Sequence, residues 1–349
     1  MRKIFRSCIW CAVWGIVLSA CTCSTETAIQ NVLGARSEAP VFIACKAVSA
    51  TEITFQFSRS VRVSSLYFDP PVAVGSVSAG DLVSITLTGA METGRTLIGG
   101  ERIVADMVVE DEHGNTLNVV VPFRTRNDNV PPLLMTELRT EYSKPKVEYV
   151  ELKTLGAGNM GALRLFIASN GLETPVFEFP PAAVGKDEYI LVHLRTLDQE
   201  NSVDETGADL AASPYSKDYE SFTDVRDFWA PEAKKRVQKK GDAIILMDQD
   251  DRVIDAVLIS EAADSWWNTE NLTRAAELLG KQGAWLSAGG AAVPGPGDAA
   301  SSRNATATRT ICRDETVPDS NSAADWYITV SSGNTPGKAN NVKRFQPKE

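Results

Sequence analysis

The stretches Gly241-Asp242-Ala243-Ile244-Ile245-Leu246-Met247-Asp248 and Arg252-Val253-Ile254-Asp255-Ala256-Val257 decide the fold of the larger part of this chain. Both are short apolar runs rich in β-branched residues, which is typical of buried β-strands. The residues between them, Gln249-Asp250-Asp251, are polar and belong to the types that favour tight turns. The two stretches therefore predict a β-hairpin with strands over 242–247 and 253–259.

Further short strands are expected on both sides of this hairpin. In the first part of the chain, Ile53, Phe55 and Phe57 alternate with polar residues, which is the pattern of a half-buried strand. No convincing helix is predicted before Pro132, so the fold class is mainly β. Strands are expected over the following ranges: 83–87, 102–109, 116–121, 133–138, 146–153, 162–168 and 188–194.

The strand pattern is interrupted at Arg126-Asn127-Asp128-Asn129-Val130-Pro131-Pro132, which is polar and ends in paired prolines. Such a stretch is typical of a short, stiff linker. We therefore expect two tandem immunoglobulin-like β-sandwiches. The first, which resembles bacterial immunoglobulin-like modules, covers 41–126. A linker over 127–132, a second sandwich over 133–342 and a tail over 343–349 follow.

Four segments of the second region resemble, in the same order, the lamin-tail domain family. They are Leu134-Met135-Thr136-Glu137-Leu138 with Val147-Glu148-Tyr149-Val150-Glu151-Leu152, then the hairpin, then Asp319-Ser320-Asn321-Ser322-Ala323-Ala324-Asp325-Trp326, and finally Thr335-Pro336-Gly337-Lys338-Ala339-Asn340. The resemblance covers about 133–341 and implies an immunoglobulin-like β-sandwich.

This region departs from a minimal lamin-tail domain by two long, partly helical insertions, at 196–240 and 260–303. Within the first, a short helix is expected around 231–237. In the second, residues 269–281 place apolar side chains at helical spacing and predict an amphipathic helix. The following glycine-rich run, 288–297, is expected to be too flexible to pack. Loops on a rigid scaffold commonly carry function.

The N-terminus has the features of a lipoprotein signal. Arg2, Lys3 and Arg6 precede an apolar run over 8–18, which is too short to span a bilayer as a helix. Leu18-Ser19-Ala20-Cys21 then resembles the lipobox of bacterial lipoproteins, in which the cysteine is acylated. We expect a signal peptide over 1–20, membrane lipid as a partner through acylated Cys21, and a tether over 21–40. This places the protein in the bacterial cell envelope, facing the periplasm or the cell surface. An ordinary cleaved signal peptide, or a chance apolar start, is the alternative.

Charge and cysteine content narrow the possible functions. The net charge of −10 argues against broad binding to nucleic acid, because neutralising phosphates needs a basic surface. If Cys21 carries lipid, Cys23, Cys45 and Cys312 allow at most one disulfide. Their spacing does not match that of a zinc site, and no metal or cofactor is predicted.

Residues suited to catalysis are few. His113 lies in a predicted turn, and His193 is expected on a strand, facing solvent or half buried. Glu148 and Glu151 stand three residues apart on a predicted strand, so their side chains should point to opposite faces. A paired-carboxylate mechanism is therefore not expected. The chain is predicted not to be an enzyme.

Two surface features suggest binding instead, and both lie in the insertions. The cations Lys234, Lys235, Arg236, Lys239 and Lys240 fall within seven residues, and Trp266 and Trp267 are adjacent. A solvated loop and core packing are the simpler readings of these two features. The sequence favours a non-catalytic binding or scaffolding role, with an envelope protein or a glycan as the possible partner. A carbohydrate-binding or adhesive surface module and an envelope hydrolase with an unrecognised site are the alternatives.

Overall fold

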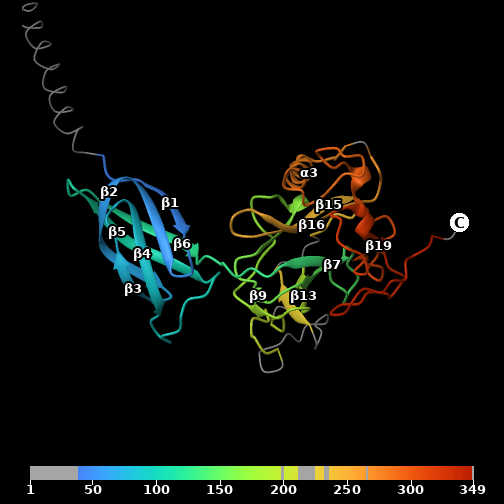
Figure 1. Ribbon diagram of the computed structural model, residues 1–349, viewed down its shortest axis with the longest axis horizontal. Helices are drawn as coiled ribbons and strands as arrows, with labels where there is room; N and C mark the ends of the chain where they lie inside the picture. The colour runs from blue at the N-terminus through green and yellow to red at the C-terminus, as the bar shows by residue number, and fades with distance from the viewer. Residues whose placement is uncertain (1–37, 198–199, 211–224, 232–235, 265, 348–349) are drawn as a thin grey trace, which may run out of the picture. The chain divides into compact units, whose positions relative to one another are not determined.

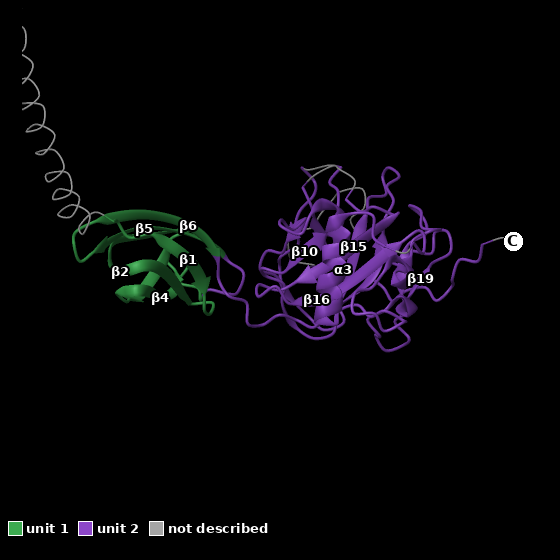
Figure 2. Ribbon diagram, turned by 90° about the horizontal axis from the view of Figure 1, so that it is seen from above, with its two compact units in different colours: residues 1–96, 102–123 green, residues 97–101, 124–349 purple. Residues whose placement is uncertain are grey.

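The computed structural model describes residues 38–197, 200–210, 225–231, 236–264 and 266–347. These residues form a mainly β structure with several sheets, which confirms the predicted fold class (Figure 1). The chain divides into two compact units, coloured separately in Figure 2. Unit 1 contains the residues up to Thr96 and Arg102–Phe123, and unit 2 contains Leu97–Glu101 and Arg124–Glu349.

Unit 1 is a six-stranded sheet in which neighbouring strands run in the order β3-β4-β2-β5-β6, with β1 also paired to β2. The central strand β2 is 18 residues long. Its first half pairs with β1 and β4, and its second half pairs with β5. The strands are β1 (Phe42–Ala47), β2 (Glu52–Asp69), β3 (Val72–Val77), β4 (Gly80–Ala90), β5 (Arg102–Asp111) and β6 (Thr116–Arg124).

The core of unit 1 follows from the period-two pattern of its strands. Ile53, Phe55 and Phe57 are buried while the residues between them are partly exposed. Their partners on β4, Val83 and Ile85, are also buried. Alternating side chains point to opposite faces of a strand, so one apolar face of the sheet supplies the core.

Unit 2 is built from two main sheets. The first has the order β14-β13-β8-β7-β18-β19 and the second has the order β11-β10-β15-β16-β17, while β9 and β12 form a small pair. The strands are β7 (Leu133–Arg139), β8 (Tyr149–Thr154), β9 (Gly158–Asn159), β10 (Arg164–Ile167), β11 (Phe177–Glu178), β12 (Ala183–Val184), β13 (Tyr189–His193), β14 (Arg226–Trp229), β15 (Gly241–Met247), β16 (Val253–Ser260), β17 (Ala300–Ser301), β18 (Ile311–Arg313) and β19 (Trp326–Ile328). Three short 3-10 turns are described at Ala168–Asn170, Pro296–Asp298 and Ala323–Asp325.

The two main sheets share one apolar core, which makes unit 2 a β-sandwich. Leu152 of the first sheet and Leu165 and Ile245 of the second belong to the same buried cluster. The predicted hairpin is present as β15 and β16, paired from Gly241↔Ser260 to Met247↔Val253. All seven residues of β15 are buried, because the other sheet covers one of its faces and helix α3 packs against the other (Figure 1).

Helix α3 (Glu270–Gln282) confirms the helix predicted over 269–281. The Thr269 side chain accepts a hydrogen bond from the Leu272 backbone N–H, which caps the first turn. The helix ends at Gly283, whose φ of 68° lies in the left-handed region. Its buried face carries the expected stripe, Leu272, Ala275, Ala276 and Leu279.

The insertion predicted over 196–240 is more than a loop. It contains β14, which pairs in parallel with β13 and so extends the first sheet. A parallel neighbour requires a long crossover connection, which explains part of the length of this insertion. The short helix expected around 231–237 falls largely on residues 232–235, which lie outside the described residues.

The linker predicted over 127–132 is wrong, because these residues belong to unit 2. Asn127 is buried, and its side-chain amide donates to the Asn159 and Gly161 carbonyls at 2.8 Å each. Its backbone N–H donates to the Gln249 side chain at 2.6 Å. The polar composition that suggested a linker therefore serves hydrogen bonds within the second unit, and the boundary falls after Phe123.

Candidate functional site

One end of unit 2 brings the two predicted insertions together. Gly241 begins β15 and pairs with Ser260, which ends β16. The residues just before β15 therefore meet those just after β16, and the Glu261 backbone N–H donates to the Lys240 carbonyl at 3.3 Å. The loop that follows α3 also reaches this end, because the Trp267 indole donates to the Pro294 carbonyl at 2.9 Å.

The two adjacent tryptophans at this end differ in how far their side chains are buried. Trp267 is half-buried and packs against the core of unit 2. The side chain of Trp266 is free of that packing, and 77% of its surface is exposed. Trp266 is thus the one of the pair that can contact a partner.

The predicted cationic cluster is split by the fold. Arg236 is buried, and its carbonyl accepts hydrogen bonds from the Ser169 and Asn170 side chains, so its inclusion as a surface contact is wrong. The Lys239 ammonium lies 3.2 Å from a Glu261 carboxylate oxygen, while Lys240 is exposed. Cys21, Lys234 and Lys235 lie outside the described residues.

The glycine-rich run 288–297, expected to be too flexible to pack, is held by hydrogen bonds and packs at its C-terminal half. Asp298 organises it, because its carboxylate accepts hydrogen bonds from the Ser287 hydroxyl and from the Ala288 and Gly295 backbone N–H groups. Pro294 and Pro296 are buried. Asp298, which directly follows the run in the sequence, was the signal that sequence reasoning missed.

A polar region lies on the face of the first sheet that is turned away from the shared core. Its acidic groups are fully buried, because a C-terminal segment covers them. Glu137 of β7 and Glu151 of β8 stand directly opposite one another in the strand register, and each has 0% of its surface exposed. Burial raises the pKa of Glu137. The pKa of Glu151 is raised well above its usual value, first by burial and then by the charge of Glu137.

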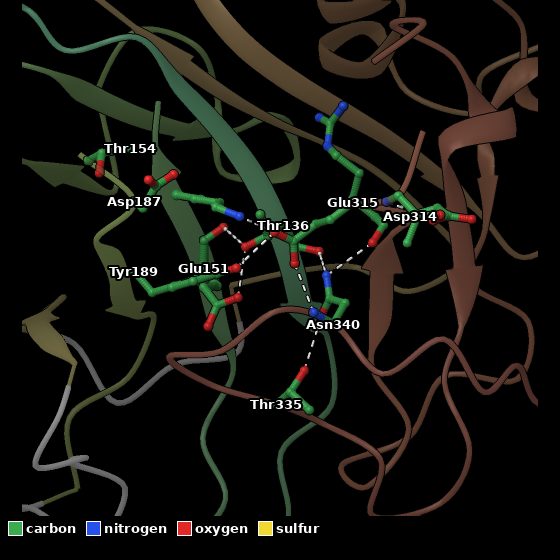
Figure 3. Close-up of polar contacts among 12 residues, drawn as sticks. Thr136, Glu151, Thr154, Asp187, Tyr189, Asp314, Glu315, Thr335 and Asn340 are labelled. Carbon is green, nitrogen blue, oxygen red and sulfur yellow. Dashed lines mark hydrogen bonds and ion pairs between the residues drawn. The ribbon is translucent and has the colours of Figure 1, made fainter. Parts of the chain in front are cut away.

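The segment Thr335–Asn340 crosses this carboxyl pair and is called the strap below. The Thr335 backbone N–H donates to Glu137 at 3.1 Å, and the Gly337 backbone N–H donates to Glu151 at 2.7 Å. The Asn340 side chain donates to the Thr136 carbonyl at 2.7 Å (Figure 3). The strap is the last of the four segments that resemble lamin-tail domains. Its hydrogen bonds therefore hold the C-terminal part of the chain onto the sheet.

His193 is fully buried, so its expected placement, facing solvent or half buried, is wrong. Its ring stacks on Trp229 with centroids 3.9 Å apart, and its Nε2 lies 2.8 Å from an Asp227 carboxylate oxygen. Both partners come from β14, the strand that sequence reasoning did not predict. His113, in contrast, is exposed in the turn between β5 and β6.

Three other buried carboxylates of unit 2 also accept hydrogen bonds from donors within the protein. Glu148 is buried and receives two hydrogen bonds of 2.8 Å from Arg195. Asp255 lies 2.8 Å from Arg313 and accepts the Met135 backbone N–H at 2.6 Å. Asp242 accepts hydrogen bonds from the backbone and hydroxyl of Ser169. Burial raises the pKa of both Asp242 and Asp255 to about 6.

Comparison with known proteins places unit 2 among sequence relatives. A family model described as "protein second domain" matches residues 131–328, which is more than half of the chain. A protein of Treponema pallidum (strain Nichols) named "Uncharacterized protein" is 25% identical over 195 residues, which cover 54% of this chain and 48% of that protein. The chain thus spans about half the length of the curated relative that it matches.

A solved structure with some similarity is the N-terminal part of the bacterial S-layer protein SbsC. It is 15% identical, with a TM-score of 0.24, over 48% of this chain and 44% of the other. A score of this size does not assign a shared fold. The resemblance to lamin-tail domains therefore stays a prediction from the sequence.

Proposed function

We propose that this chain, which belongs to the family described as "protein second domain", is a lipid-anchored envelope protein whose second unit binds or scaffolds without catalysis. The observation that carries this proposal is the lipobox-like Leu18-Ser19-Ala20-Cys21 after the apolar run. Acylation at Cys21 would supply the membrane attachment, and two acyl chains give the two signals that stable anchoring requires. Among the described residues, no helix is long and apolar enough to span a bilayer.

The buried polar groups of unit 2 support a non-catalytic role. Hydrolysis by paired carboxylates or by a histidine needs these groups to face a substrate. His193 and Glu148 are instead fully buried and bonded to Asp227 and Arg195. Trp266 and Lys240, which are exposed in the loops next to β15 and β16, offer side chains suited to binding.

A carbohydrate-binding or adhesive module is the second candidate, and exposed Trp266 is the observation that favours it. Indole rings stack on sugar faces, and aromatic side chains are common anchors of interfaces. An envelope hydrolase with an unrecognised site is the remaining candidate, and it would need catalytic groups other than the buried His193 and Glu148.

The anchoring proposal is tested by expressing the full chain in a bacterial host and labelling it with an alkyne analogue of palmitate. The parent chain should incorporate label and partition with membranes, and Cys21→Ser should do neither. Cys23→Ser is the matched control, because it removes a thiol two residues away and should leave labelling unchanged. Equal labelling of the parent and the Cys21→Ser variant would refute lipidation at this position.

A further inference from the structure

Two loops of unit 2 are hydrogen-bonded to one another, and each exposes apolar residues on the surface. The first follows β16, the second follows α3, and the hydrogen bond between Trp267 and the Pro294 carbonyl joins them. We call this surface the twin-loop tip and define it as Ala262, Ala263, Trp266 and residues 288–293. All of these residues are exposed.

The twin-loop tip is almost free of charge. Residues 288–293 read Ala-Gly-Gly-Ala-Ala-Val, so none of them has an ionisable side chain. Trp266 and Val293 leave 77% and 43% of their surfaces exposed. Among the described residues of the first loop between Ala262 and Trp267, Asp264 is the single charged one. Contiguous exposed apolar patches often mark interaction sites.

The second loop of the tip, residues 288–293, is held in place by contacts with the rest of unit 2. The Asp298 carboxylate fixes both ends of the second loop through Ala288 and Gly295. Gly280 of α3 packs closely against Ala292, because a β-carbon at position 280 would collide with the Ala292 carbonyl oxygen. A loop that is already fixed loses little conformational entropy when it binds.

We propose that the twin-loop tip inserts into the interfacial region of a phospholipid bilayer and thereby orients unit 2 against the membrane. Tryptophan is enriched at the level of lipid headgroups, where one end of the indole is apolar and its N–H is wet. The small side chains of 288–293 carry no hydrogen-bonding groups with which to recognise a sugar. Exposed Lys240, at the base of the tip, can meet anionic headgroups.

This inference rests on the proposed function in one respect, because acylated Cys21 is what keeps the chain at a bilayer. The acyl chains would provide retention, and the tip would select which surface of unit 2 faces the lipid. The two contributions can therefore be measured separately.

The test uses the chain from residue 21 onward with Cys21→Ser, so that no acyl chain contributes. Binding is measured by sedimentation with vesicles of phosphatidylcholine alone and with an equimolar mixture of phosphatidylcholine and phosphatidylglycerol. The parent should bind the anionic vesicles, with a blue shift of tryptophan fluorescence and quenching by brominated acyl chains. Trp266→Ala should weaken binding by about tenfold and abolish the spectral shift.

Two charge variants should have opposite effects on binding to anionic vesicles. Lys240→Gln should weaken binding by about fivefold, and Asp264→Asn should strengthen it by about the same factor, as expected for one charge near a lipid surface. The matched controls, Tyr67→Ala for an exposed aromatic and Lys186→Gln for an exposed cation, should change nothing. Both control residues are more than half exposed.

Three outcomes would overturn the inference while leaving acylation of Cys21 intact. One is absence of vesicle binding by the parent. Another is binding that Trp266→Ala leaves unchanged. The third is self-association or glycan binding that depends on Trp266 while vesicles are not bound, which would assign the tip to a protein or sugar. Failure of palmitate labelling, in contrast, would refute anchoring and leave the vesicle result standing.

Discussion

Glu137 of β7 and Glu151 of β8 are direct partners across an antiparallel strand pair, and neither carboxyl is exposed to solvent. Like charges directly opposite one another destabilise a sheet, and burial adds a large desolvation cost to each charge. Neutral donors offset part of this cost, and the charge of Arg139 also favours the ionised form of Glu137. The Thr335 and Gly337 backbone N–H groups and the Thr136 hydroxyl all donate to the two carboxyls.

The first prediction concerns how stability depends on pH through this pair. Both pKa values are raised in the folded protein, so the contribution to stability is fully present below the ordinary Glu pKa of about 4.3 and is lost as pH rises through the raised values. Glu137→Gln removes one titrating group and keeps its shape. It should therefore increase the free energy of unfolding at pH 8 by about 1–2 kcal/mol, with little effect at pH 4.

Urea denaturation of both proteins at the two pH values measures this difference. Glu112→Gln is the control, because that carboxyl is exposed and should show no such dependence. An equal change at pH 4 and pH 8 would mean that Glu137 is ionised to the same degree in the folded and unfolded chains.

The second prediction concerns the strap. Asn340 donates to the Thr136 and Arg313 carbonyls, so Asn340→Ala leaves two carbonyl groups without this partner. The free energy of unfolding should fall by about 1–3 kcal/mol. Hydrogen exchange at residues 330–345 should accelerate more than exchange in β15. Asn341→Ala, next in sequence, should have a smaller effect because its side chain accepts from the exposed Lys343 N–H. Uniform acceleration throughout unit 2 would contradict a local role.

Apolar patterns predicted much of this fold, because half-buried strands repeat every two residues, buried strands form continuous apolar runs, and amphipathic helices repeat about every three to four residues. The hairpin, helix α3 and the strand-rich character of both units all follow from such patterns. Strand β14 did not, because it lies within a long polar insertion and pairs in parallel with β13. Its absence from the prediction is also why His193 was expected nearer to solvent.

Polar residues were harder to place, because the same composition suits a loop and a buried hydrogen-bond network. Asn127 resembles a linker residue in sequence but bonds to carbonyls inside unit 2. Likewise, sequence proximity grouped Arg236 with Lys240, although the fold buries the first and exposes the second. Among the predicted binding residues that the structure describes, Trp266 and Lys240 are exposed, Trp267 and Lys239 are partly exposed, and Arg236 is buried.

The third prediction concerns the buried ion pair of Asp255 and Arg313. The Arg313 side chain also bonds to Asp319 and to the Met135 carbonyl, so it is fixed on several sides. Asp255→Ala removes its buried partner and also the acceptor of the Met135 N–H. The free energy of unfolding should fall by about 3–5 kcal/mol in chemical denaturation.

The matched control for this pair is Arg344→Met, which breaks the more exposed contact with Asp314. It should cost at most about 1 kcal/mol, because solvent screens such pairs. Similar losses for the two variants would show that the Asp255 pair contributes no more than a surface contact.

The last prediction separates the two neighbouring tryptophans. Trp267 packs against the core and donates to the Pro294 carbonyl, so Trp267→Ala removes apolar contact and one hydrogen bond. We expect a loss of about 2–4 kcal/mol in the free energy of unfolding. Trp266→Ala should stay within about 0.5 kcal/mol, because most of that side chain is already in water. Urea titrations followed by circular dichroism measure both. A large loss for Trp266→Ala would show that its indole supports the loops, and its effect on vesicle binding would then reflect a disturbed tip rather than a lost contact.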